Sequence, residues 1–436
     1  MGCAMNEWNQ LLSFAQQTSL GDVPPEVVAR AKLILLDSMG AIIHGNQTEE
    51  VRQFATMHAA SDGVPVLGLS ILVPEVIAAM ANAQGMVSQE LDEGNVYAKG
   101  HPASHILPAL LAVAYRQNSA GAPFLESFLL GYEISARLGH AIRLKPAIHP
   151  HGNWAMVGGS LAVGKLLGWT GEKLAQALAM SASLPMVSLW ENAFHGHRIR
   201  DVYVGVVNAV NTLVPSLVSA GYTASLNGFQ AIFDGILGEG LDWEKAVSRL
   251  GSEYFLMKNY FKELSYCRYC HSPIEAVAAL IQQESIDWKT VRRIDVYTYR
   301  AAAQLNRQTV ENAFAAKFSI PAAMADWLCQ RYPELDAEAL AKKIFVHEDA
   351  AIEAKLPAER NSRVVVTLSD GTVLSHYQVG AKGDPQHPFQ EDDVKQKLLD
   401  LAGPVIGRDR CFRLIDVCLN IERHDVDYLI RLCIGP

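Results

Sequence analysis

Residues 362–380 are SRVVVTLSDGTVLSHYQVG, two β-rich runs that meet at Asp370-Gly371. An Asp-Gly pair between such runs predicts a tight hairpin, because glycine tolerates the positive φ that the turn requires. Residues 291–300, VRRIDVYTYR, alternate between apolar and polar side chains in the same strand-like way. Helical patterns lie between these strands. We therefore expect an α+β domain over residues 263–387.

The sequence on both sides of this segment has the periodicity of helices. Apolar residues recur at i, i+3 and i+4 spacing in residues 27–43 and again in residues 391–402. Several of these helices are apolar on more than one face, which favours packing in layers. The predicted fold is mainly α. A large all-helical domain comprises residues 1–262 and 388–436, and a smaller α+β lid domain is inserted near the C-terminus.

The composition excludes several classes of function. The chain has 436 residues and a formal charge of −9, which argues against nucleic-acid binding because that needs a basic face. The most apolar stretch, residues 64–86, is interrupted by prolines and polar residues, so we expect no membrane span. Residues 1–10 lack the basic and apolar regions of a signal peptide, and we expect a cytoplasmic protein.

A C-x-x-C-H motif at Cys267, Cys270 and His271 raises three possibilities: attached haem, half of a zinc site, or a redox dithiol. The seven cysteines are scattered, and no second C-x-x-C pair completes a zinc site. We therefore favour buried thiols that are incidental to function. The cations beside them, Lys262 and Arg268, suit the recognition of a carboxylate, and surface salt bridges are the alternative.

Residues 88–108 combine acids with a histidine at a helix entrance. Glu90, Asp92 and Glu93 precede His101-Pro102, and together they could supply a general base and the group that orients it. A solvated loop with a capping histidine is the alternative.

Two H-x-H pairs occur further along the chain. His149 and His151 precede a glycine-rich helix start, where free N–H groups suit an anion, and His195 and His197 form the second pair. Neither pair has helical i, i+4 spacing or a clear acidic partner, so we predict no metal site. Residues 159–166 fail the P-loop pattern at Leu166, and no dinucleotide fingerprint follows a strand, so we predict no cofactor.

The order of these motifs resembles the MmgE/PrpD family, which includes 2-methylcitrate dehydratase, cis-aconitate decarboxylase and iminodisuccinate epimerase. The stretch LILLDSMGA, the acidic loop ending in His101-Pro102, His149-Pro150, the segment 260–271 and GDPQHP at 383–388 follow one another over the whole chain. The resemblance implies a homodimer, an active site between the two domains, and catalysis without metal or organic cofactor.

The resemblance also implies roles for individual residues. The implied catalytic residues are His101, Lys262, Glu90, Asp92 and His149, with His101 as the base. The implied substrate-binding residues are Arg200, Tyr203, Arg268, His271, His151 and Asn95. This chain departs from the family pattern at a threonine, which is replaced by Gly94 or Asn95, at a lysine that aligns with Arg200, and at a lid tyrosine without a clear equivalent.

These departures leave the shared first step, which is removal of a proton next to a carboxylate. We therefore predict a cofactor-independent lyase, dehydratase-like, or an epimerase that acts on a small di- or tricarboxylic acid. An iminodisuccinate-type epimerase or a decarboxylase is the alternative within the family. A non-catalytic carboxylate-binding dimeric protein is the alternative of another class, motivated by the lost threonine and tyrosine.

Overall fold

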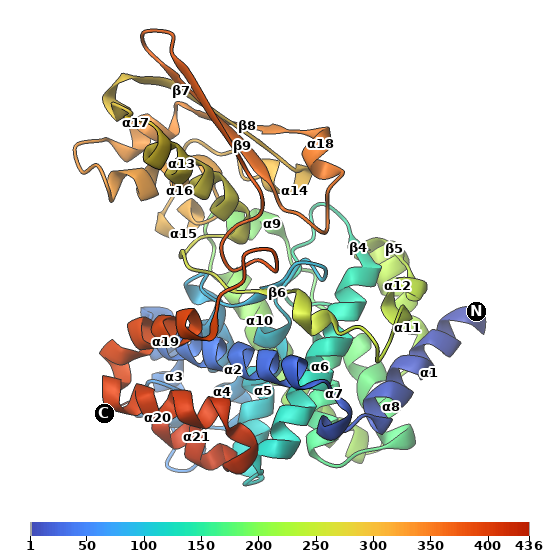
Figure 1. Cartoon of the computed structure of the whole chain (residues 1–436). Helices are drawn as coiled ribbons and strands as arrows, with labels where there is room; N and C mark the ends of the chain where they lie inside the picture. Colours follow the sequence, from blue (N-terminus) through green and yellow to red (C-terminus); the bar gives the residue numbers. More distant parts are fainter. Residues whose placement is uncertain (1, 436) are drawn as a thin grey trace. The chain divides into compact units, whose positions relative to one another are not determined.

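The computed structural model describes residues 2–435, which form two compact units (Figure 1). The helical unit comprises Met1–Leu189, Ile199–Phe261 and Phe389–Pro436. The α+β unit comprises Lys262–Pro388 and also Trp190–Arg198, a segment that the prediction placed in the helical domain. The mainly helical fold with a mixed-sheet region towards the C-terminus agrees with the prediction.

The helical unit is built from long helices around one apolar core. Helix α2 (Pro25–Gly45) covers the predicted helix at 27–43, and it packs against α4 and α19. The helices of this unit are α1 (Gly2–Gln17), α2, α3 (Glu49–Met57), α4 (Glu75–Ser88), α5 (Pro102–Arg116), α6 (Gly121–Ala141), α7 (Met156–Leu166), α8 (Gly171–Ala182), α10 (Ile199–Ser219), α11 (Asn227–Ala231), α12 (Trp243–Val247), α19 (Glu391–Ile406), α20 (Arg408–Leu419) and α21 (Val426–Leu432).

Three short antiparallel ribbons accompany these helices. They pair β1 (Val64–Pro65) with β2 (Leu72–Val73), β3 (Gly94–Asn95) with β6 (Asn259–Tyr260), and β4 (Ile142–Leu144) with β5 (Gly238–Leu241). The second ribbon matters for function, because it ties the acidic loop to a segment more than 150 residues further along the chain by its Gly94–Tyr260 register.

Helix α5 carries a proline in its interior, and helix α10 repairs the resulting gap. Pro108 has no N–H to donate to Ser104 O, so this carbonyl lacks its normal helical partner. The side chain of Asn208 on α10 bonds to α5 on both sides of this interruption. Its Nδ2 donates to Ser104 O (2.8 Å), and its Oδ1 accepts from the amide of Ala109 (3.0 Å). Nearby, Asn211 Nδ2 donates to His105 O (3.0 Å). The first turns of α5 are therefore held in place by α10.

Helix α10 is also the one helix of the described residues with enough length and apolar character to cross a membrane. It packs against α4, α5 and α7, and its buried asparagines bond to α5 as described. Burying amides that are satisfied by a neighbouring helix is typical of the core helix of a helical domain.

The α+β unit contains a four-stranded sheet of order β10-β9-β7-β8. The hairpin predicted at Asp370-Gly371 joins β9 (Ser362–Leu368) to β10 (Val373–Gln378), and β7 (Val291–Thr298) pairs antiparallel with β9. Helices α13 (His271–Gln283) and α16 (Ile320–Cys329) pack against the strands.

The remaining short helices of this unit are α9 (Trp190–Phe194), α14 (Arg300–Ala303), α15 (Ala313–Ala316), α17 (Ala337–Ala341) and α18 (Ala350–Glu353). Helix α17 ends at Ala341, and β8 (Ile344–Glu348) follows it. Strand β8 runs parallel to β7, so the chain between them forms a crossover.

The repair of α5 by α10 predicts a dependence between two residues. Asn208→Ala leaves Ser104 O and the Ala109 N–H without partners, and we expect a loss of about 1–3 kcal/mol in the free energy of unfolding for each buried group. In a Pro108→Ala background the helix can form its own bonds to these groups. The cost of Asn208→Ala should then fall by at least half in denaturant unfolding. Equal costs in both backgrounds would contradict this account.

Candidate active site

The acidic loop follows α4 and is shaped by its own backbone and side chains. Glu90 has a positive φ of 57°, which turns the chain sharply after the helix. Asn95 holds the far side of the loop: its Oδ1 accepts from the amides of Tyr97 and Ala98, and its Nδ2 donates to Phe255 O. Because both ends of this amide contact backbone groups, the position of Asn95 supports a structural role, and its predicted role in substrate binding stays a prediction.

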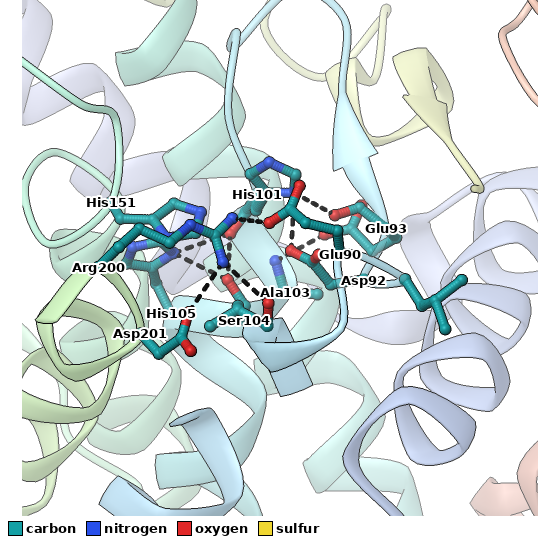
Figure 2. A network of polar contacts seen from close by, with 12 residues as sticks. Glu90, Asp92, Glu93, His101, Ala103, Ser104, His105, His151, Arg200 and Asp201 are labelled. Atoms are coloured by element: carbon teal, nitrogen blue, oxygen red, sulfur yellow. Dashed lines mark hydrogen bonds and ion pairs between the residues drawn. The ribbon is translucent and has the colours of Figure 1, made fainter. Parts of the chain in front are cut away.

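His101 lies at the start of α5, and the Nδ1 edge of its ring is directed at the acidic loop (Figure 2). Its Nδ1 is 2.7 Å from the carbonyl oxygen of Glu93 and 2.8 Å from Asp92 Oδ2. A carbonyl oxygen only accepts, so Nδ1 carries the proton. The lone pair of neutral His101 is therefore on Nε2, which is the arrangement of a histidine base oriented by a carboxylate.

The side chain of Glu93 is held inside the protein. Its Oε1 accepts from the amide of Ala103 (2.9 Å), and its Oε2 accepts from the hydroxyl of Tyr132 on α6 (2.7 Å). Burial nonetheless raises the pKa of Glu93 to about 8, and the nearby Asp92 adds to this effect. Glu93 is therefore mostly protonated at neutral pH, so the carboxyl group adds little negative charge beside Asp92.

Two more histidines have their ring nitrogens bonded to the backbone. His105 Nε2 accepts from the amide of Gly152 (2.9 Å), so its Nδ1 carries the proton and donates to His101 O (2.8 Å). His149 Nδ1 accepts from the amide of His151 (3.1 Å), which places the proton of neutral His149 on Nε2. Burial lowers the pKa of His105 to about 4 and the pKa of His149 well below its usual value, so both rings are neutral.

The backbone amide of Gly152 donates the hydrogen bond to His105 Nε2. Its φ is 84°, a left-handed conformation that favours glycine, and its amide points at His105. A Cβ at this position would lie 3.1 Å from the Cβ atoms of Met186 and Tyr203. The turn therefore fits tightly under Tyr203, which is itself buried on α10.

His151 lies among the other three imidazoles. Its ring centroid is 4.5 Å from that of His149, 5.1 Å from that of His101 and 5.5 Å from that of His105. The side chain is fully buried, and neither ring nitrogen has a hydrogen-bond partner among residues 2–435. Burial, and then the charge of Arg200, lower the pKa of His151 well below its usual value.

Arg200 enters this group from the first turn of α10 and is buried. Its guanidinium forms an ion pair with Glu90 and lies 3.1 Å from Asp201 Oδ1, and its Nη1 donates to Val87 O (2.8 Å). The buried cation is therefore compensated by two carboxylates, as a buried charge requires. The structure brings together Glu90, Asp92, His101, His151 and Arg200 (Figure 2). His149 lies against His151, and the sequence singled out all six residues.

Asp92, His101 and His151 also have the composition of a metal site. Their potential ligand atoms lie within 4.8 Å of one another. A transition-metal ion binds such atoms at about 2.0–2.2 Å and needs a lone pair from each histidine. The Nδ1 of His101 carries a proton and faces both Glu93 O and Asp92, so this arrangement fits a hydrogen-bonded proton site better than a metal site.

The remaining predicted residues belong to the α+β unit. Arg268 lies 2.8 Å from Asp384 Oδ1 through Nη2, and its Nη1 contacts His271 Nδ1 at 3.2 Å. His271 Nε2 in turn donates to Tyr266 O (3.1 Å). Arg268 and His271 thus form one buried network that holds the GDPQHP segment, and Lys262 is buried at the start of the unit. Cys267 and Cys270 are buried and form no disulfide bond, and their being incidental to function stays a prediction.

Comparison of the whole sequence with known proteins identifies the family of this chain. The model of the MmgE/PrpD N-terminal domain matches residues 9–230, and the model of the MmgE/PrpD C-terminal domain matches residues 265–421. The chain belongs to the MmgE/PrpD family. The resemblance inferred from the ordered motifs is thereby confirmed, and the chain is an MmgE/PrpD-family enzyme.

Several MmgE/PrpD relatives align along nearly their whole length. A cis-aconitate decarboxylase of Aspergillus terreus is 23% identical, with 98% of this chain and 96% of that protein aligned. The human cis-aconitate decarboxylase is 27% identical, with 96% and 92% aligned. The mouse protein of the same name is 22% identical, with 94% and 90% aligned. At these identities the relatives support the family and leave the exact reaction open.

The sequence analysis does not single out two members of this candidate site, His105 and Tyr132, and it names Glu93 only together with the other acids. His105 was passed over, although its i, i+4 spacing from His101 was visible in the sequence. Glu93 was noticed as one of three acids without a role of its own. Tyr132 could not be found from local pattern, because α6 brings it to Glu93 from 39 positions away.

The raised pKa of Glu93 predicts a specific pH dependence. Folding favours the protonated form, so the stability that this group contributes is full below its ordinary pKa of 4.5 and is lost as the pH rises to about 8. Glu93→Gln keeps the neutral state at every pH. We expect the unfolding free energy of the variant to gain on that of the wild type between pH 5 and pH 8, as measured by urea titration. A difference that does not change with pH would contradict this.

Metal independence can be tested at one defined place. Elemental analysis of the purified protein should show no stoichiometric zinc or iron, and chelation should leave activity unchanged. Stoichiometric metal that is lost in the variant His151→Leu would overturn this prediction and would assign the ion to Asp92, His101 and His151.

Proposed function

We propose that this chain is a cofactor-independent lyase or epimerase that removes a proton from a carbon next to a carboxylate of a small di- or tricarboxylic acid. The observation that carries this proposal is the orientation of His101. Its Nδ1–H is directed at Glu93 O with Asp92 beside it, which leaves Nε2 as a base. As Nε2 takes the proton, the adjacent Asp92 carboxylate stabilises the imidazolium that forms.

The carbanion formed in this step is the difficult part of the reaction. Its charge delocalises into a group that is already anionic, so the site needs cations and N–H donors directed at the developing charge. His149 Nε2–H is a neutral donor of this kind, because its Nδ1 is already an acceptor. Arg200 is balanced by Glu90 and Asp201, and Arg268 by Asp384, so the roles of Lys262 and Arg268 towards the substrate stay predictions.

The second step decides the reaction class. Loss of a β-hydroxyl gives a dehydratase, reprotonation on the opposite face gives an epimerase, and loss of CO2 gives a decarboxylase. The names of the relatives make cis-aconitate the first substrate to assay, and citrate and 2-methylcitrate follow from the dehydratase alternative. We further propose a cytoplasmic homodimer, which light scattering of the purified protein can test for its oligomeric state.

Solvent exchange tests the first step independently of the second. Incubation of the wild-type protein with cis-aconitate, citrate or 2-methylcitrate in D2O should wash deuterium into a carbon next to a carboxylate, as followed by NMR. If none of these acids or of a wider polycarboxylate panel exchanges, the catalytic proposal fails and a carboxylate-binding protein becomes the better account.

His101→Gln should lower both exchange and turnover by about 10²–10⁴-fold, because a lost general base typically costs that much. Binding of the acid should persist, because the carboxylate contacts remain. His58→Gln is the matched control, since His58 is exposed at the end of α3 and lies against Phe54. Near-normal exchange in His101→Gln would show that another group, His149 first, is the base.

A further inference from the structure

His151 differs from its neighbours in the state of its ring nitrogens. Both nitrogens of His105 bond to backbone groups, Nδ1 of His149 accepts a backbone amide, and Nδ1 of His101 faces Glu93 O and Asp92. His151 is fully buried, yet both of its nitrogens lack a hydrogen-bond partner among the described residues 2–435. A buried polar group in this state costs stability, and such groups usually have a functional reason.

The position of His151 relative to His101 suggests what that reason is. The two rings meet edge to face with centroids 5.1 Å apart, and the potential ligand atoms of Asp92, His101 and His151 lie within 4.8 Å of one another. Two hydrogen bonds of about 2.8 Å that meet on one oxygen at about 115° span about 4.7 Å. This span is within the 4.8 Å limit, so a bridging oxygen of a substrate or of water is part of the inference below.

We propose that His151 is the second proton-transfer residue of this site, which carries the proton taken up by His101 to the group that is protonated in the second step. The proposal rests on the proposed function and adds a catalytic residue to it. An imidazole relays a proton only if one nitrogen can accept while the other donates, and His151 is the member of the four-histidine cluster with neither nitrogen bonded to the protein.

The steps balance as follows. His101 Nε2 takes the proton from the substrate carbon, and the C–H electron pair moves into the carboxylate-stabilised carbanion. The imidazolium of His101 gives a proton to the bridging oxygen, which passes one of its own protons to the lone-pair nitrogen of His151. The N–H on the other side of His151 then gives its proton to the departing hydroxyl group or to the carbon. His151 ends as the other tautomer and returns to its first tautomer by exchange with solvent.

The burial of His151 favours a role as a proton relay over a role as an acid that is already protonated between turnovers. Desolvation, the charge of Arg200 and the neighbouring rings keep His151 neutral between turnovers. A neutral ring neither competes with His101 for the substrate proton nor holds a positive charge that would have to be compensated. It needs to carry a positive charge only while the proton passes.

The test separates the two steps on one substrate. In His151→Gln and His151→Leu, we expect product formation from the acid that the wild type converts to fall by about 10²–10⁴-fold, the usual effect of losing a proton-transfer group. The rate of deuterium exchange into the same acid should fall by less than about tenfold in these variants, because the exchange step needs only His101. Equal losses of exchange and product formation, or unchanged product formation, would overturn the role of His151.

Stability provides a second readout and a control. His151→Leu removes a ring without partners, so the urea midpoint should stay the same or rise. His105→Leu removes a ring with both nitrogens bonded, so its midpoint should fall. A fall in His151→Leu as large as that in His105→Leu would show a structural role and overturn the proposal. Absence of exchange in the wild type would instead overturn the proposed function, and this inference with it.

Discussion

The hydrogen bond from His101 Nδ1 to the carbonyl oxygen of Glu93 is the contact on which the rest of the site depends. A backbone oxygen cannot donate, so this bond sets the tautomer of His101 more firmly than a hydroxyl partner would. The turn at Glu90, the closure of the loop by Asn95 and the capture of the Ala103 amide by Glu93 all serve to hold that one oxygen at the start of α5.

Glu90, Asp92 and Glu93 lie within four positions of a buried loop, where three negative charges would repel one another strongly. A different interaction reduces this repulsion at each of them. Glu90 pairs with Arg200, Glu93 takes up a proton at neutral pH because burial raises its pKa to about 8, and Asp92 lies against His101. The electrostatic environment of His101 is therefore dominated by one carboxylate. The compensation of Glu90 requires Arg200 from a helix distant in sequence, and at Glu93 the effect of burial outweighs the hydrogen bond from Tyr132, which lowers the pKa.

Periodicity predicted the elements that depend on local pattern: α2, α19, and the hairpin of β9 and β10. Other features depend on tertiary contacts. Strand β8 follows α17 because it pairs with β7, and the interruption of α5 at Pro108 is tolerated because Asn208 lies opposite. In the site, Glu90, Asp92 and His101 could be found from one loop, whereas no local pattern reveals which imidazole nitrogens lack partners.

Four imidazoles packed at ring distances of 4.5–5.5 Å impose a constraint of their own. His105, His149 and His151 are desolvated, and a positive charge on any one of them raises the cost of charging the others, which adds to the effect of Arg200. The cluster therefore accommodates about one added proton at a time. In the proposed function that proton is taken up by His101, which has the Asp92 carboxylate beside it, while His105, His149 and His151 stay neutral. A second buried carboxylate next to His151 would trap the proton and stop the reaction.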